Sequence, residues 1–187
     1  MLRIDRIRLF HGRMSCDLRF SYGAVAAFAW SAAEIRAGKW TGVGECLHAA
    51  PAEVVPWAAA LLGQDALRLD ALIAPIEFDW GRSVIREMLS MALHDLAARA
   101  MGAPLYVLLG GLRRARVPLM PCLFPPSPEE AEARARRFVE MGFTALKVKN
   151  FGDAARDCAL IRAVRRALPK GFLQSDPNGG YKRLEEA

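Results

Sequence analysis

Two lysines stand two residues apart in a stretch of the sequence that is otherwise apolar. The stretch is Gly142–Asn150, Gly-Phe-Thr-Ala-Leu-Lys-Val-Lys-Asn, and its apolar run is typical of a β-strand. Successive strand side chains point to opposite faces, so Lys147 and Lys149 share one face, and two aliphatic residues fill the other. Ammonium groups at the end of a buried parallel strand are costly unless an anionic group meets them. The pattern therefore predicts an anion site, unless the strand lies at an exposed edge, where lysines serve only solubility.

A second segment with polar groups follows, Ser175–Tyr181, which reads Ser-Asp-Pro-Asn-Gly-Gly-Tyr. It comes at the end of a short apolar run, Gly171–Ser175, and Asp153–Leu168 before that run has the apolar spacing of a helix. Strand, helix and strand in this order predict a right-handed βαβ unit. The strands of such a unit end at the same edge of the sheet, where α/β barrels hold their catalytic groups. We therefore expect the lysines beside Asp176 and Asn178, although Asp-Pro-Asn-Gly is also typical of a plain turn.

Residues 1–115 are predicted to form an α+β domain that supports this unit. The alternation of apolar and polar residues predicts a three-stranded antiparallel sheet with strands at Arg3–Phe10, Val25–Arg36 and Trp40–Cys46. The polar segment His11–Gly23 is expected to be a loop. Apolar residues at helical spacing predict helices at Pro51–Leu62 and Arg82–Met101, and Leu105–Leu109 is a short apolar segment.

Residues 116–187 are predicted to form three βα units, because a Gly-Gly pair, three arginines and a proline mark a change of pattern near residue 115. The first strand is expected at Val117–Phe124. A helix follows to about Met141, with Ser127 as N-cap and Pro128 at the first helical position. Lys182–Ala187 is expected to be the first turn of a third helix.

Composition narrows the class of protein. The chain has 187 residues, 53% of them hydrophobic, which is enough for real cores and argues against disorder. Four cysteines without a C-x-x-C motif predict reduced thiols and a cytoplasmic location. The net charge of +6 indicates either an anion-attracting surface or solvated helix faces. No pattern typical of nucleic-acid binding or of membrane insertion is present, so we expect neither partner.

Five stretches, taken in order, carry a likeness to a known family. The whole chain resembles the first half of the enolase superfamily, specifically the mandelate racemase/muconate lactonising enzyme group. The matching stretches are Trp40-Thr-Gly-Val-Gly-Glu45, Ala92-Leu-His-Asp-Leu-Ala-Ala-Arg99, Gly102-Ala-Pro-Leu-Tyr-Val-Leu-Leu-Gly-Gly111, Gly142–Lys149 and Asp176-Pro-Asn-Gly-Gly-Tyr181. The resemblance implies an α+β capping domain over residues 1–115, followed by the first three βα units of a TIM-type barrel over residues 116–187.

The resemblance also implies a reaction. In this family a base removes the proton α to a substrate carboxylate, and bound Mg²⁺ stabilises the enediolate that results. By position, Lys149 matches the base, and Lys147 matches a companion that favours the neutral form of the base and offsets carboxylate charge. Asp176 matches the first Mg²⁺ ligand, since hard cations prefer carboxylate oxygens.

Three further residues match positions that meet the substrate. Asn178 matches a polar residue that approaches metal-bound substrate. Phe20 and Tyr22 lie where the mobile loop of the capping domain closes over the substrate, and so are expected to contribute to specificity.

The resemblance leaves the reaction open. Asp-Pro-Asn-Gly before an aromatic residue favours a sugar-acid dehydratase, with a racemase next; the alternatives are the cycloisomerase and dipeptide-epimerase branch, or a non-catalytic fragment. The family uses three carboxylate ligands and a base on the opposite face, and only the first ligand lies in this sequence. We therefore expect an incomplete barrel, no turnover by this chain alone, and a homo-oligomer acting on a small carboxylate in the full-length form.

Overall fold

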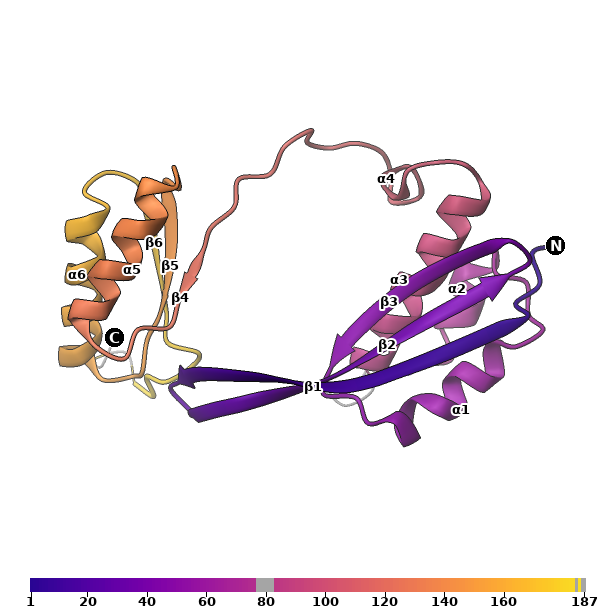
Figure 1. Ribbon diagram of the computed structural model, residues 1–187, viewed down its shortest axis with the longest axis horizontal. Helices are drawn as coiled ribbons and strands as arrows, with labels where there is room; N and C mark the ends of the chain where they lie inside the picture. The colour runs from indigo at the N-terminus through magenta and orange to yellow at the C-terminus, as the bar shows by residue number, and fades with distance from the viewer. Residues whose placement is uncertain (77–82, 184, 186–187) are drawn as a thin grey trace. The chain divides into compact units, whose positions relative to one another are not determined.

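Figure 1 shows the computed structural model of the protein, which describes residues 1–76, 83–183 and 185. The chain folds as two compact units. The first comprises Met1–Ser15 and Ala27–Ala115, and the second comprises Cys16–Ala26 and Arg116–Ala187. A long strand pair thus begins in the first unit and turns in the second.

The first unit is built on a sheet with the order β1-β2-β3. Its strands are β1 (Arg6–Phe20), β2 (Gly23–Ala37) and β3 (Trp40–Leu47), and β2 pairs with β3 in antiparallel register from Ala37 opposite Trp40 to Trp30 opposite Leu47. Alternate residues of β2 enter the core, because a strand shows every second side chain to the same face. Ala33, Ile35 and Ala37 are fully buried in this way.

The predicted loop at His11–Gly23 was wrong. β1 continues to Phe20 and β2 begins at Gly23, so only a two-residue turn separates them. The segment contains an alternation of half-buried and exposed residues that is typical of a strand. Cys16, Leu18 and Phe20 are half-buried, whereas Asp17 and Arg19 between them are exposed. A hairpin also pairs the backbone polar groups that a loop of this length would leave to solvent.

The described residues of the first unit form four helices after its sheet: α1 (Pro51–Leu61), α2 (Leu69–Ile73), α3 (Ser83–Ala100) and α4 (Leu105–Leu108). The helices predicted at Pro51–Leu62 and Arg82–Met101 are confirmed to within one residue, with Arg82 itself outside the described residues. The short helix α2 was not predicted, and the apolar segment at Leu105–Leu109 forms a helical turn. The core of this unit joins α3 to the sheet through Ile85, Met88, Leu89, Ala92, Leu93 and Leu96.

Two glycines let the backbone of β3 touch helix α3. A Cβ atom added at Gly42 would lie 2.1 Å from the carbonyl oxygen of Ala92, and one added at Gly44 would lie 2.0 Å from that of Met88. Real Cβ atoms do not approach backbone atoms so closely. The Gly-Val-Gly sequence is therefore required by the packing of β3 on α3.

Replacing Gly44 with alanine is expected to lower the free energy of unfolding by about 3 kcal/mol, because overpacking against helix backbone cannot be relieved by a side-chain rotation. Urea denaturation of the protein measures this change. Val43→Ala is the matched control, since Val43 is exposed and belongs to the same strand; it should cost about 1 kcal/mol or less. Equal stability of Gly44→Ala and the parent would contradict the observed contact.

The second unit holds a parallel sheet with the order β4-β5-β6. Along the chain its elements are β4 (Cys122–Leu123), α5 (Pro128–Glu140), β5 (Ala145–Lys149), α6 (Ala154–Ala167) and β6 (Phe172–Asp176). The two helices pack beside each other on one face of the sheet (Figure 1), in a core that includes Leu146, Val148, Leu160 and Val164. The predicted βαβ unit is therefore confirmed.

Details of this unit confirm one prediction and correct another. Ser127 caps α5, since its side chain accepts a hydrogen bond from the backbone N–H of Glu130, and Pro128 begins the helix. The strand predicted at Val117–Phe124 is only Cys122–Leu123, because pairing with β5 reaches no further, and Val117 and Leu119 are exposed. The helical turn expected at Lys182–Ala187 includes residues 184, 186 and 187, which lie outside the described residues.

This architecture agrees with an α+β arrangement joined to parallel βα units. Within the part of the chain that the structure describes, no helix combines the length and the apolar character needed to cross a bilayer.

Candidate functional site

Strand β5 presents two lysines on the face opposite the helices. Exposure alternates along the strand, so that Leu146 and Val148 are fully buried under α5 and α6 while the lysines point the other way. The side chains of Lys147 and Lys149 are 26% and 12% exposed. Because β5 lies between β4 and β6, the alternative of solubilising lysines on an edge strand is wrong.

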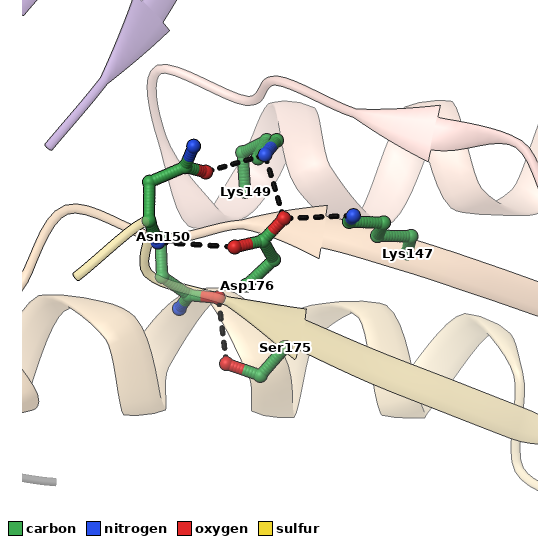
Figure 2. A network of polar contacts seen from close by, with 6 residues as sticks. Lys147, Lys149, Asn150, Ser175 and Asp176 are labelled. Carbon is green, nitrogen blue, oxygen red and sulfur yellow. Dashed lines mark hydrogen bonds and ion pairs between the residues drawn. The ribbon is translucent and has the colours of Figure 1, made fainter. Parts of the chain in front are cut away.

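Asp176 meets both lysines at the carboxyl end of β6. It lies directly opposite Lys149 in the parallel register of β5 and β6. Its Oδ2 atom is 2.7 Å from Nζ of Lys147 and 2.6 Å from Nζ of Lys149. Figure 2 shows the two ammonium groups converging on this carboxylate. The structure thus places the three predicted residues together, and the carboxylate offsets the cost of partly burying two cations.

Asn178 completes this group from the turn that follows β6. Its backbone N–H donates to Oδ1 of Asp176 at 3.0 Å, and its side-chain oxygen accepts a hydrogen bond from Nζ of Lys149. The backbone of Asn178 has φ +49°, in the left-handed region that asparagine tolerates better than most residues. The Asp-Pro-Asn-Gly sequence therefore forms a turn and also directs two polar groups toward Lys149.

The charges of the cluster stabilise one another. Hydrogen bonds from Lys147 and then Lys149 hold the pKa of Asp176 well below its usual range, and the hydrogen bond to Asp176 raises the pKa of Lys147. Burial raises the pKa of the neighbouring Cys122 thiol. The cluster therefore keeps a net positive charge at neutral pH, and Cys122 stays a thiol rather than a nucleophilic thiolate.

Removing this carboxylate should change how stability depends on pH. Because the pKa of Asp176 is lowered in the folded state, its contribution is complete above the unfolded value near pH 4 and is lost as the pH falls further. In metal-free buffer, Asp176→Asn should be less stable than the parent by about 1–2 kcal/mol at pH 7, a range that allows for partial solvent screening. The difference should shrink toward pH 2 in denaturant titrations, and a difference independent of pH would contradict the ion pairs.

Two predicted aromatic residues lie on the hairpin tip, which belongs to the same unit. The rings of Phe20 and Tyr22 stack with centroids 4.9 Å apart and planes 7° from parallel. Nζ of Lys149 lies 5.7 Å from the Phe20 ring centroid, within the range of a cation–π contact, and Phe20 also meets Phe124 edge to face. Phe20 is thus brought to the lysine cluster, and Tyr22 stacks on Phe20.

Comparison with known proteins identifies the family. Residues 130–187 match the family called Enolase C-terminal domain-like. N-succinylamino acid racemase of Thermus thermophilus is 32% identical over 134 residues, which are 67% of this chain and 36% of that protein. The chain belongs to the mandelate racemase/muconate lactonising enzyme group of the enolase superfamily.

Other members of this superfamily resemble the chain in the same way. Cis-3-hydroxy-L-proline dehydratase of Roseibium aggregatum is 31% identical over 129 residues, 68% of this chain and 35% of that protein. The crystal structure of a dipeptide epimerase from Methylococcus capsulatus, complexed with Mg and the dipeptide L-Arg-D-Lys, matches with a TM-score of 0.81 and 25% identity over 96% of this chain and 55% of that one. The chain therefore spans about a third of the curated relatives, 36% and 35% of their lengths.

The described residues do not by themselves form a magnesium site. Among them, no group of three His, Cys, Asp or Glu side chains is placed to hold a metal ion. Asp176 is the carboxylate of the cluster, and its oxygens accept hydrogen bonds from Lys147, Lys149 and the backbone of Asn178. Mg²⁺ takes six oxygen ligands in octahedral geometry, with waters completing the set. One carboxylate beside two ammonium groups does not satisfy that need.

Two buried polar residues beside the cluster were not predicted. Asn150 is fully buried; its N–H donates to the backbone oxygen of Asp176, and its side-chain oxygen accepts from the hydroxyl of Ser175 (Figure 2). Asp157 is 1% exposed. A signal for Asp157 was present, because it shares the apolar face of α6 with Leu160 and Val164 at helical spacing.

Proposed function

We propose that the intact protein is a racemase or epimerase that exchanges the proton α to a carboxylate, with Lys149 as the group that moves this proton. The observation that carries the proposal is the convergence of Lys147 and Lys149 on one oxygen of Asp176. In this proposal residues 1–115 are the capping domain, residues 116–187 begin the barrel, and Asn178, Phe20 and Tyr22 face the substrate.

The geometry supports two states of Lys149. As an ammonium group it donates to Asp176 and to Asn178, so that a proton is held at Nζ and can be delivered to a carbanion. As an amine it can accept the α-proton. Lys147 also attracts the carboxylate of the substrate. Mg²⁺, which the family resemblance implies and of which Asp176 would be one ligand, would stabilise negative charge on the carboxylate oxygens.

The substrate proposed is an N-acylated amino acid or a dipeptide. The racemase and the epimerase compared above are named for such compounds, and the dehydratase is named for a hydroxyproline. None of the three is named for a sugar acid, so the sugar-acid dehydratase expected from Asp-Pro-Asn-Gly finds no support in these relatives. The stacked rings of Phe20 and Tyr22 offer an apolar surface beside Lys149, which suits an acyl group or an amino-acid side chain better than a polyol.

Proton exchange in D₂O tests the proposal directly. The intact protein is incubated with Mg²⁺ and N-succinyl amino acids, dipeptides or sugar acids, and loss of the α-proton signal is followed by ¹H NMR. We expect exchange with amino-acid derivatives that stops in EDTA. Exchange confined to sugar acids, with a keto product, would replace this proposal with the dehydratase, and no exchange with any carboxylate would refute it.

A second candidate is a non-catalytic protein in which the lysine–aspartate cluster is structural. The absence of a three-residue metal group among the described residues favours it. Calorimetric titration with Mg²⁺ separates the two, because the structural alternative predicts no saturable binding to the intact protein.

A further inference from the structure

One buried carboxylate connects the loops that follow β5 and β6 through hydrogen bonds. Asp157, on α6, accepts hydrogen bonds from the backbone N–H groups of Phe151 and Gly152 at 2.9 and 3.0 Å. It also accepts from the hydroxyl of Tyr181 at 2.7 Å. The first two donors lie in the loop after β5, and Tyr181 lies in the loop after β6. A single side chain thus binds both loops.

A glycine pair holds the same loops in backbone contact. Gly152 has φ +78°, and a Cβ atom there would lie 2.7 Å from the carbonyl carbon of Gly180. A Cβ atom at Gly180 would lie 2.9 Å from Cα of Gly152. Neither position accepts a side chain without displacing the other loop. The Gly-Gly-Tyr sequence after Asn178 is therefore shaped to fit the loop after β5.

Because Asp157 is buried, its carboxylate depends on these hydrogen bonds. A charged group that is 1% exposed is costly unless hydrogen bonds replace its water. Asp157 gains a further contribution from its place in the first turn of α6, where the helix dipole favours negative charge. Burial, and then the hydrogen bond to Asp157, raise the pKa of Tyr181 to about 12, so its hydroxyl remains a donor across the working range of pH.

The two loops begin beside Lys149, which is proposed to move the proton, and beside Asp176, which binds it. The first loop starts after Lys149, and the second starts after Asp176 and contains Asn178. Between them, the N–H of Asn150 donates to the backbone oxygen of Asp176 at 3.0 Å. A shift of one loop would therefore change the separation between Nζ of Lys149 and its acceptors on the other.

We propose that Asp157 and Tyr181, with the Gly152–Gly180 contact, form a clasp that positions Lys149 against Asp176 and Asn178 for proton transfer. This role rests on the proposed function above. Neither residue touches the lysine cluster in the contacts described, so both are positioning residues rather than catalytic ones. The clasp acts on the transfer step, because it fixes the alignment of the proton donor and not the charge that attracts the substrate.

Tyr181→Phe tests the clasp, since it removes one hydroxyl and keeps the ring. In the intact protein, kcat for α-proton exchange should fall about tenfold while KM changes less than about twofold. The isotope effect with α-deuterated substrate should rise, because a misaligned transfer becomes more rate-limiting. If the substitution only reduced the amount of folded enzyme, the rate would fall and the isotope effect would stay the same. That result would overturn the positioning role. Tyr106→Phe, in α4, is the matched control and should change none of these values.

Amide hydrogen exchange gives an independent reading that needs no activity. In Tyr181→Phe the amides of Phe151 and Gly152 should exchange about tenfold faster, while the amide of Ala131 in α5 keeps its rate. Unchanged rates at Phe151 and Gly152 would overturn the clasp even if the protein is active. An inactive parent with faster exchange at these amides would instead refute the proposed function and leave the loop contact standing. Asp157→Asn should give the same pattern of exchange with a larger effect.

Discussion

Replacing Lys149 with alanine is expected to reduce α-proton exchange by the intact protein at least about a thousandfold, near the upper part of the range for general acid–base groups. Lys149 holds its proton between Asp176 and Asn178, and its side chain is 12% exposed, so bulk water is poorly placed to substitute for it. The fold should survive, because Leu146 and Val148 carry the packing of β5 from its other face. Exchange in D₂O and circular dichroism measure the two expectations.

Lys170→Ala is the matched control for this change. Lys170 is an exposed lysine in the same unit, so its removal changes the net charge equally without touching the cluster. It should exchange the α-proton at the rate of the parent. A Lys149→Ala protein that retains normal exchange would exclude Lys149 as the proton-transfer group, and the proposal would then pass to Lys147.

The arrangement of the cluster was predictable because it depends on short-range rules. Because side chains alternate along a strand, Lys147 and Lys149 share one face of β5. Because a βαβ crossover joins neighbouring parallel strands, the ends of β5 and β6 lie side by side. The structure confirms both features, with Lys149 directly opposite Asp176. The catalytic roles of these residues remain predictions.

Features that depend on contacts between distant segments were not predictable in the same way. The hairpin tip places the ring centroid of Phe20 5.7 Å from Nζ of Lys149. These residues are far apart in sequence, and nothing in the sequence between them indicates that they meet. The strand predicted at Val117–Phe124 was too long because only Cys122 and Leu123 pair with β5, although β5 itself begins at Ala145. Asp157 was not singled out from the sequence, since its partner Tyr181 lies in a loop beyond the next strand. In each case tertiary partners, rather than local propensity, decided the outcome.

Replacing Asp176 with asparagine is expected to reduce α-proton exchange at least about a hundredfold, although Lys149 remains in place. The parent cluster pairs two ammonium groups with one carboxylate, and the variant leaves both cations without it. Their mutual repulsion would separate the two side chains, and the pKa of Lys147, which the carboxylate raises, would fall. An asparagine oxygen is also a weaker ligand for a hard cation than a carboxylate.

Two measurements separate these causes in Asp176→Asn. If Asp176 is one of the Mg²⁺ ligands of the intact protein, calorimetric affinity for Mg²⁺ should fall at least about tenfold, whereas Asp70→Asn, an exposed acidic residue in α2, should bind as the parent does. If Asp176 serves only to hold the lysines, Mg²⁺ affinity should be unchanged while exchange is lost. Normal exchange in Asp176→Asn would contradict both roles. The proton transfer would then not depend on the ion pairs at the ends of β5 and β6, which carry the proposed function.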